Sequence, residues 1–256
     1  MTELVRVERH GFVAELVLDR PSALNALSVA MAAAVSSAAS SLDASVRAVV
    51  LSSSQERAFC VGADLKERNA SSDDDLRAQR PVMRAAFAAV RDLPVPVVAA
   101  VSGFALGGGY ELALSCDLIV ADETAVVGLP ETSVGIVPGG GGTQLLGRRA
   151  GWAVASDLIF TARRVPAAEA LSLRLVDRVV PAGAARSAAL ELAARIAGNS
   201  PVGIRAAKRA MRLGATADLP TALEYEHEAW ETTAFSPDRA EGVRAFVEKR
   251  PPTWPT

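Results

Sequence analysis

The sequence contains few residues of the kinds that build disulfides, metal centres or histidine-based catalytic sites. It has only two cysteines, Cys60 and Cys116, and two histidines, His10 and His227, in 256 residues. Two cysteines form no disulfide framework, and the four side chains together have no metal-ligand spacing. The two histidines also offer little material for a Ser-His or Cys-His pair. We therefore expect two small thiols in the core and no bound metal.

Long apolar runs and an excess of positive charge are also missing. The longest apolar stretches, such as residues 95–101, have the length of a strand and fall far short of the roughly 20 residues that span a bilayer. The first ten residues mix charges and match neither a secretory signal nor a transit peptide. The formal net charge of −2 gives no general attraction to a phosphate backbone. These absences predict a soluble cytoplasmic protein that binds neither a membrane nor nucleic acid.

Half of the residues are hydrophobic, which is enough for a large core, and strands alternate with helices in the N-terminal part. Alternation over residues 4–9 and 13–18 predicts a β-hairpin. Beyond Gly151 the segments are mostly helical. The pattern predicts an α/β core over residues 1–195 and a helical region over residues 196–256. Further strands are expected over residues 47–52, 95–101, 118–121 and 175–180, and helices over residues 28–42, 75–93, 153–160, 167–173, 184–197, 201–213, 219–233 and 237–248.

Two glycine-rich segments stand at positions typical of ligand loops. Gly107 to Gly109 lie between a strand and a helix, but Leu112 occupies the place of the last glycine in a dinucleotide fingerprint. The run from Gly139 to Gly142 lacks the lysine of a phosphate loop. Neither segment supports nucleotide binding or hydrolysis.

Backbone N–H groups beside the first glycine segment are candidates for holding a developing negative charge. N–H groups in the first turn of a helix have no intrahelical acceptor, and the helix dipole favours negative charge there. A second turn of this kind is expected at Gly62-Ala63-Asp64, with Asp64 as the N-cap of a short helix. Together the two turns suggest an oxyanion hole. The structural alternatives are tight packing of helix on sheet and an ordinary strand–turn–helix.

Two glutamates, Glu111 and Glu131, lie in apolar stretches of the sequence. A carboxylate near buried surface is paired, exposed at an edge, or shifted in pKa for acid–base chemistry. The structural alternatives are favourable placement at a helix N-terminus for Glu111 and a turn position for Glu131. Because there is no G-x-S-x-G segment and histidine is scarce, any proton transfer falls to carboxylates.

Five segments that contain these residues follow one another along nearly the whole chain. They are Arg20-Pro21 with Leu24-Asn-Ala-Leu27, Phe59-Cys-Val-Gly-Ala-Asp-Leu-Lys-Glu67, Gly103-Phe-Ala-Leu-Gly-Gly-Gly-Tyr-Glu-Leu-Ala-Leu-Ser-Cys-Asp117, Gly128-Leu-Pro-Glu-Thr-Ser-Val-Gly-Ile-Val-Pro-Gly-Gly-Gly-Gly-Thr-Gln144 and Phe246-Val-Glu-Lys-Arg250. In order and combination they resemble the crotonase family, the enoyl-CoA hydratases and isomerases. The resemblance implies a spiral of ββα units with a helical C-terminal region that forms trimers, often paired into hexamers.

The resemblance also implies an activity and its residues. The expected reaction is addition of water to an α,β-unsaturated acyl-CoA thioester in fatty-acid or branched-chain acyl catabolism, without a metal or redox cofactor. Ala63 and Gly108 would supply the oxyanion-hole N–H groups, and Glu111 and Glu131 would handle the water. Residues implied in substrate binding are Ser22, Leu24, Ala63, Asp64, Leu65, Lys66, Gly139 and Lys249, the last reaching the nucleotide end of coenzyme A in a neighbouring subunit.

Alternative activities within the resemblance stay open. A double-bond isomerase would need only the carboxylate at Glu131. Leu129 stands where many straight-chain hydratases have glutamine. The Gly-Leu-x-Glu sequence that it forms with Gly128 and Glu131 is similar to that of methylglutaconyl-CoA hydratases. A substrate with a distal carboxylate would want a basic partner such as Arg77, Arg80 or Arg84, although an arginine face on a helix can also be simply solvated. Outside catalysis, some relatives bind RNA, and an idle family member could serve as an assembly subunit.

Overall fold

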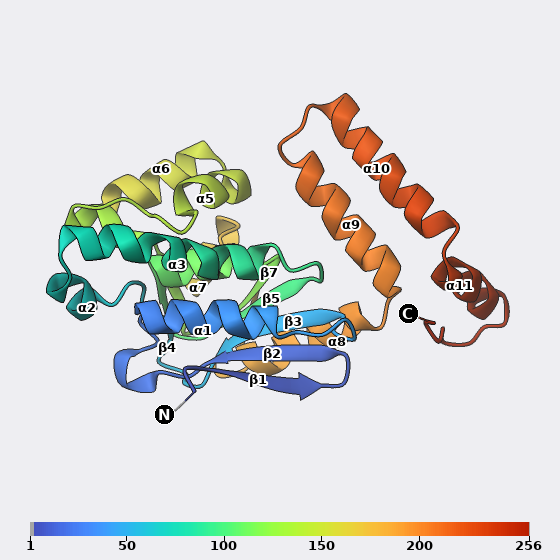
Figure 1. Ribbon diagram of the computed structural model, residues 1–256, viewed down its shortest axis with the longest axis horizontal. Helices are drawn as coiled ribbons and strands as arrows, with labels where there is room; N and C mark the ends of the chain where they lie inside the picture. The colour runs from blue at the N-terminus through green and yellow to red at the C-terminus, as the bar shows by residue number, and fades with distance from the viewer. Residues whose placement is uncertain (1–2, 256) are drawn as a thin grey trace.

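The computed structural model describes residues 3–255 and arranges them as two sheets with helices packed around them (Figure 1). The larger sheet has the strand order β1 (Val5–His10), β2 (Val13–Leu18), β3 (Ala48–Ser53), β5 (Val97–Val101), β7 (Leu118–Asp122) and β10 (Arg178–Val180). The smaller sheet has the order β4 (Ala58–Cys60), β6 (Phe104–Leu106), β8 (Val126–Gly128) and β9 (Val165–Pro166). Pairing is parallel except between β1 and β2 and between β8 and β9.

The chain alternates between the two sheets as it advances. Strands β3, β5 and β7 join the larger sheet, and each is followed directly by a strand of the smaller sheet, β4, β6 and β8. One or more helices follow each pair of strands, which gives the predicted spiral of ββα units. The helices of this part are η1 (Pro21–Ala23), α1 (Val29–Ser40), α2 (Leu65–Ala70), α3 (Asp73–Arg91), α4 (Gly108–Leu114), η2 (Pro130–Val134), α5 (Gly142–Ala150), α6 (Trp152–Thr161), α7 (Ala167–Ser172) and α8 (Ala185–Ala197).

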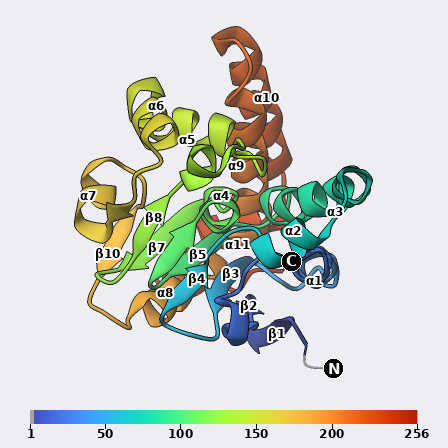
Figure 2. The same cartoon turned by 90° about the vertical axis from the view of Figure 1, so that its left-hand side faces the viewer.

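The central strands are covered on both faces, which explains their nearly continuous apolar sequence. On one face, residues such as Leu16 and Leu51 pack with α1 and α3 in the main core. On the other face, Val50 and Val98 pack against Leu192 of α8 in a second core cluster. Figure 2 shows the sheets between these layers of helices.

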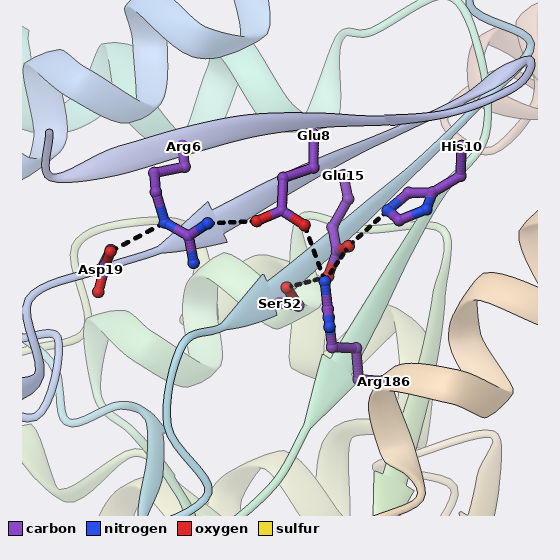
Figure 3. Close-up of polar contacts among 7 residues, drawn as sticks. All are labelled: Arg6, Glu8, His10, Glu15, Asp19, Ser52 and Arg186. Atoms are coloured by element: carbon purple, nitrogen blue, oxygen red, sulfur yellow. Dashed lines mark hydrogen bonds and ion pairs between the residues drawn. The ribbon is translucent and has the colours of Figure 1, made fainter.

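An ion pair between the buried Glu15 and the half-exposed Arg186 ties the N-terminal hairpin to α8 (Figure 3). Glu15 is fully buried in β2, and its carboxylate accepts hydrogen bonds from Arg186 Nε at 2.7 Å, Arg186 Nη2 at 2.8 Å and Ser52 Oγ at 2.6 Å. The Nη2 group of Arg186 also donates to Glu8 at 2.9 Å. Burial raises the pKa of Glu15, but the bonds from Arg186, Ser52 and His10 outweigh it and hold the pKa below its ordinary value. Folding thus brings His10 close to two carboxylates, Glu8 and Glu15, both of which already pair with Arg186.

Three helices after α8 form an arm that projects from the body: α9 (Pro201–Gly214), α10 (Leu219–Ala234) and α11 (Pro237–Val247) (Figure 1). The boundary predicted near residue 195 falls in the last turn of α8. The arm is attached through Lys208 of α9, whose Nζ donates to the Val95 carbonyl and to the Asp117 carboxylate, both at 2.7 Å. Within the described residues, no helix is both long and apolar enough to cross a bilayer.

Most predicted elements are confirmed within a few residues of their expected bounds. The hairpin is present, and Asp64 caps α2 by accepting from the N–H groups of Lys66 and Glu67. Both thiols are free and buried, as expected. The strand expected over residues 175–180 is shorter, because only residues 178–180 pair with β7.

Candidate active site

Most of the predicted site residues line one cavity of about 850 Å³. Its walls come from the end of β6 and the start of α4, from α3, from η2, and from the segment that follows β4. The predicted residues on these walls are Ala63, Asp64, Leu65, Gly108, Glu111, Glu131 and Gly139. The volume is typical of a small-molecule site.

Two backbone N–H groups approach each other at one end of the cavity. The residues flanking Ala63 pair with Leu27, since Leu27 N donates to the Gly62 carbonyl at 2.7 Å and Asp64 N donates to the Leu27 carbonyl at 3.0 Å. Backbone alternation therefore turns the Ala63 N–H away from Leu27. Gly108 is the first residue of α4, so its N–H has no acceptor within the helix. The Ala63 nitrogen lies 3.8 Å from the point where a Cβ of Gly108 would stand.

Glycine is required on both sides of this junction because the backbones and Glu131 lie so close. Gly107 has a φ of +54°, and a Cβ there would lie 2.9 Å from Glu131 Oε1. Gly62 has a φ of +94°, and its Cβ would lie 2.8 Å from the Leu106 carbonyl oxygen. A side chain at either position would push apart the two N–H groups or displace the glutamate.

Glu111 is held firmly in the first turn of α4. It is only 3% exposed, and its Oε1 accepts from the N–H groups of Gly140 and Gly142, each at 2.7 Å. Burial raises the pKa of Glu111 above its ordinary value, although the two N–H groups oppose this shift. The glycine run therefore orients the carboxylate of Glu111.

Glu131 lies on η2 and is bonded quite differently. It is 8% exposed, and its Oε2 is buried without a hydrogen-bond partner among the described residues. Burial raises the pKa of Glu131 to about 7, and the nearby charge of Glu111 adds to the shift. A carboxyl group with this pKa is populated in both protonation states near neutrality and can take or release a proton.

Four predicted substrate-binding residues do not line the cavity. Ser22 lies in η1 and Leu24 caps its end, where the Leu24 carbonyl accepts from Val61 N at 3.3 Å. Lys66 is exposed on α2, beside the cavity. Lys249 lies two residues after α11, and Figure 1 shows α11 at the opposite end of the molecule from α2. Any contact between Lys249 and a substrate would therefore be made in the cavity of another copy.

The structure adds residues to the site that motif spacing did not single out. Arg20 Nη1 donates to Asp64 Oδ2 at 2.7 Å and fixes the segment that carries Ala63. The buried side chain of Asn25 donates to the Phe59 carbonyl at 3.0 Å and holds the preceding turn. Arg20 and Asn25 both lie in the Arg20-to-Leu27 segment, one of the five segments that carry the family resemblance. Their place in that segment was the one sign in the sequence that they belong to the site.

Helix α3 contributes to the wall of the main cavity, but its arginines differ in position. Among Arg77, Arg80 and Arg84 of α3, only Arg80 lines the main cavity, together with the apolar Met83 and Phe87. Leu129, which the sequence associates with the choice of substrate, is fully buried and does not line it. Any effect of Leu129 on the acyl group would therefore pass through neighbouring residues.

Comparison with known proteins gives one consistent family. The enoyl-CoA hydratase/isomerase family matches residues 8–256. The chain is 39% identical over 248 residues to the short-chain-enoyl-CoA hydratase of Clostridium acetobutylicum, covering 96% of this chain and 95% of that protein. It is 41% identical over 253 residues to the mitochondrial methylglutaconyl-CoA hydratase of Homo sapiens, covering 96% of this chain and 74% of that protein.

Solved structures agree with this assignment. The crystal structure of an enoyl-CoA hydratase from Bacillus anthracis is 40% identical and superposes with a TM-score of 0.96, covering 98% of each chain. The chain therefore belongs to the enoyl-CoA hydratase/isomerase family and has the crotonase fold. The resemblance drawn from the five sequence segments is confirmed.

Proposed function

We propose that the protein is an enoyl-CoA hydratase in which Glu111 and Glu131 act on water beside an oxyanion hole formed by Ala63 and Gly108. The observation that carries this proposal is the presence of two buried carboxylates in the same cavity as two backbone N–H groups that have no backbone acceptor within the described residues. An isomerase needs only one of these carboxylates. The second carboxylate, Glu111, is held in place by Gly140 and Gly142. It has a role if the reaction also uses a water molecule, as hydration does.

The chemistry follows from the charges. The two N–H groups hold the thioester oxygen and draw electron density from the β-carbon of an α,β-unsaturated acyl group. Glu111, fixed by its two hydrogen bonds, orients the water. Glu131 accepts a proton from the water as its oxygen bonds to the β-carbon, and the same carboxyl group then protonates the α-carbon. Water is added without net oxidation, so the proposal includes no metal or redox cofactor.

The experiment is to measure hydration of crotonyl-CoA by wild-type protein and by Glu111→Gln and Glu131→Gln. Each substitution removes a proton-handling group and should lower kcat by about 10²- to 10⁴-fold. Glu191→Gln, an exposed change on α8, is the control and should leave the rate unchanged. Wild-type hydration that survives Glu111→Gln at full rate would contradict the two-glutamate mechanism.

The main alternative is a double-bond isomerase, because the matched family contains both hydratases and isomerases. Such an enzyme would move the double bond of a 3-enoyl-CoA and retain this activity in Glu111→Gln, because one carboxyl group suffices. Methylglutaconyl-CoA hydratase-like activity is a narrower form of the hydratase proposal. The name of the Homo sapiens relative supports it at 41% identity.

Self-association is the second part of the proposal. The arm buries none of the residues of α10 and exposes large apolar side chains, including Trp230 and Phe246. Copies that associate through this arm, as trimers or hexamers, would cover these side chains. A neighbouring arm would also bring Lys249 toward the nucleotide end of a bound coenzyme A.

A further inference from the structure

A second cavity of about 640 Å³ adjoins the active-site cavity along α3. The two cavities share Arg80, Phe87, Gly139 and Gly140, so they meet at the loop that orients Glu111. Four arginines of α3 line the second cavity, and no acidic residue of the described chain does. These arginines are Arg77, Arg80, Arg84 and Arg91.

The four guanidinium groups are not equally neutralised. Arg77 pairs with Asp74 and Arg91 pairs with Asp92, each at 2.8 Å. Arg80 makes no ion pair within the described residues and donates only to the Gly139 carbonyl, at 2.6 Å. Arg84 likewise has neither an ion pair nor a hydrogen bond there. Positions i and i+4 face each other on a helix, so two uncompensated positive charges lie side by side at a small cost in stability.

The free positive charge lies close to the reaction centre. Arg80 contacts Gly139, and the next residue, Gly140, donates to Glu111. The absence of a side chain at Gly139 makes room for the guanidinium, since a Cβ there would lie 3.0 Å from Arg80 Nη1. An anionic group paired with Arg80 would therefore stand beside the loop that orients Glu111.

We propose that the preferred acyl group carries a terminal carboxylate one or two carbons beyond the double bond, and that Arg80, assisted by Arg84, binds it. This inference rests on the proposed hydratase function and names its substrate class. Arginine binds carboxylates through paired N–H groups, and bonds of this kind are stronger than those between neutral partners. The apolar side chains of Met83 and Phe87 then contact the short carbon chain between thioester and carboxylate.

A matched pair of five-carbon substrates tests the proposal. Glutaconyl-CoA ends in a carboxylate where trans-2-pentenoyl-CoA ends in a methyl group. We expect wild-type kcat/KM to be at least about tenfold higher for glutaconyl-CoA. Arg80→Met should lower the glutaconyl-to-pentenoyl ratio by about 10- to 30-fold, the low end for charged hydrogen bonds because Arg80 is exposed to solvent. Arg84→Met should lower it by about threefold.

Two further variants separate charge from structure. Arg80→Lys keeps the charge and should retain part of the preference. Arg91→Met removes an arginine about 16 Å farther along the helix and should leave the ratio unchanged. Isothermal titration with the unreactive analogues glutaryl-CoA and pentanoyl-CoA measures binding alone, and Arg80→Met should weaken binding of the first analogue selectively.

Three results would overturn the inference. Equal wild-type rates on the two substrates would show that no carboxylate is recognised. An equal loss on both substrates in Arg80→Met would show that Arg80 only positions Gly139. If neither substrate were hydrated, the hydratase function itself would be contradicted. This result differs from a failure of carboxylate recognition alone, in which both substrates would still be hydrated.

Discussion

Glu111 and Glu131 lie in one cavity, yet their hydrogen bonding assigns them different tasks. Two backbone N–H groups fix one oxygen of Glu111, whereas Glu131 Oε2 is buried without a partner in the described chain. The first arrangement orients a carboxylate. The second makes ionisation unfavourable and brings the pKa of Glu131 to about 7. Enzymes divide acid and base roles between two carboxyl groups by giving them different environments of this kind.

The same environment predicts a pH-dependent cost in stability at Glu131. Its pKa of about 7 in the folded protein lies above the ordinary glutamate value of about 4.3. The stabilising contribution of the protonated group is therefore complete below the ordinary value and is lost as pH rises through about 7. Glu131→Gln removes this loss, so its free energy of unfolding relative to wild type should be about 2.5 kcal/mol more favourable at pH 8 than at pH 5.

Urea unfolding of both proteins at the two pH values measures this difference. Glu191→Gln, on the exposed surface of α8, corrects for general effects of removing a carboxylate. A stability difference that does not change between pH 5 and pH 8 would show that Glu131 titrates as an ordinary surface carboxyl group.

Single residues of the site could be predicted only where they belong to a motif. Ala63, Gly108, Glu111 and Glu131 were assigned by resemblance, and the structure brings all four to one cavity. The position of Arg80 could not be obtained in this way. Arg80 and Gly139 are 59 residues apart, and their contact depends on the rotation of α3 about its own axis. Helical spacing alone left Arg77, Arg80 and Arg84 equivalent.

At the scale of elements, long segments were predictable and short strands were not. The helices expected over residues 28–42 and 75–93 and the short helix capped by Asp64 are present as α1, α3 and α2. The strands of the smaller sheet have two or three residues each, too few to show a period. β4, β6 and β8 each follow a strand of the larger sheet and pair with their equivalent one turn of the spiral away, and β9 adds to β8 in antiparallel orientation.

Attachment of the arm depends on one buried lysine. Lys208 is 8% exposed, and burial lowers the pKa of its ammonium group. Its bonds to Val95 and Asp117 join α9 to the ends of β5 and β7, and Arg212 Nη2 also donates to Asp117, at 3.0 Å. These contacts fix the direction in which the arm leaves the body.

Removal of this lysine should therefore loosen α9 in particular. Lys208→Met leaves the buried Val95 carbonyl and the partly buried Asp117 carboxylate without one donor each, and it should lower the free energy of unfolding by about 2 kcal/mol. Amide hydrogen exchange should rise in α9 more than in α3. Arg209→Met is the matched control, because Arg209 is exposed and pairs with Glu228 only at 3.4 Å, so its loss should cost less than about 0.5 kcal/mol. Equal effects of the two changes would show that the buried contacts do not anchor the arm.

At the scale of the whole molecule, the arm exposes large apolar side chains of the kind that are usually buried in a core. Leu219, Leu223 and Trp230 recur on α10 at helical spacing and are 71%, 52% and 58% exposed. Exposed apolar patches of this kind mark interaction surfaces. The active-site cavity lies in the body, so self-association through the arm and catalysis can be tested by separate substitutions.

We expect wild-type protein to self-associate and Trp230→Glu to weaken that association. Burial of a large apolar side chain contributes about 1.5–3 kcal/mol, and each copy in a symmetric assembly loses it. Light scattering coupled to size exclusion at micromolar protein should give a mass of three or six chains for wild type and a smaller mass for the variant. Thr232→Glu adds the same charge on the opposite side of α10 and should not change the mass. A monomeric wild type, or equal dissociation by both changes, would contradict assembly through this face.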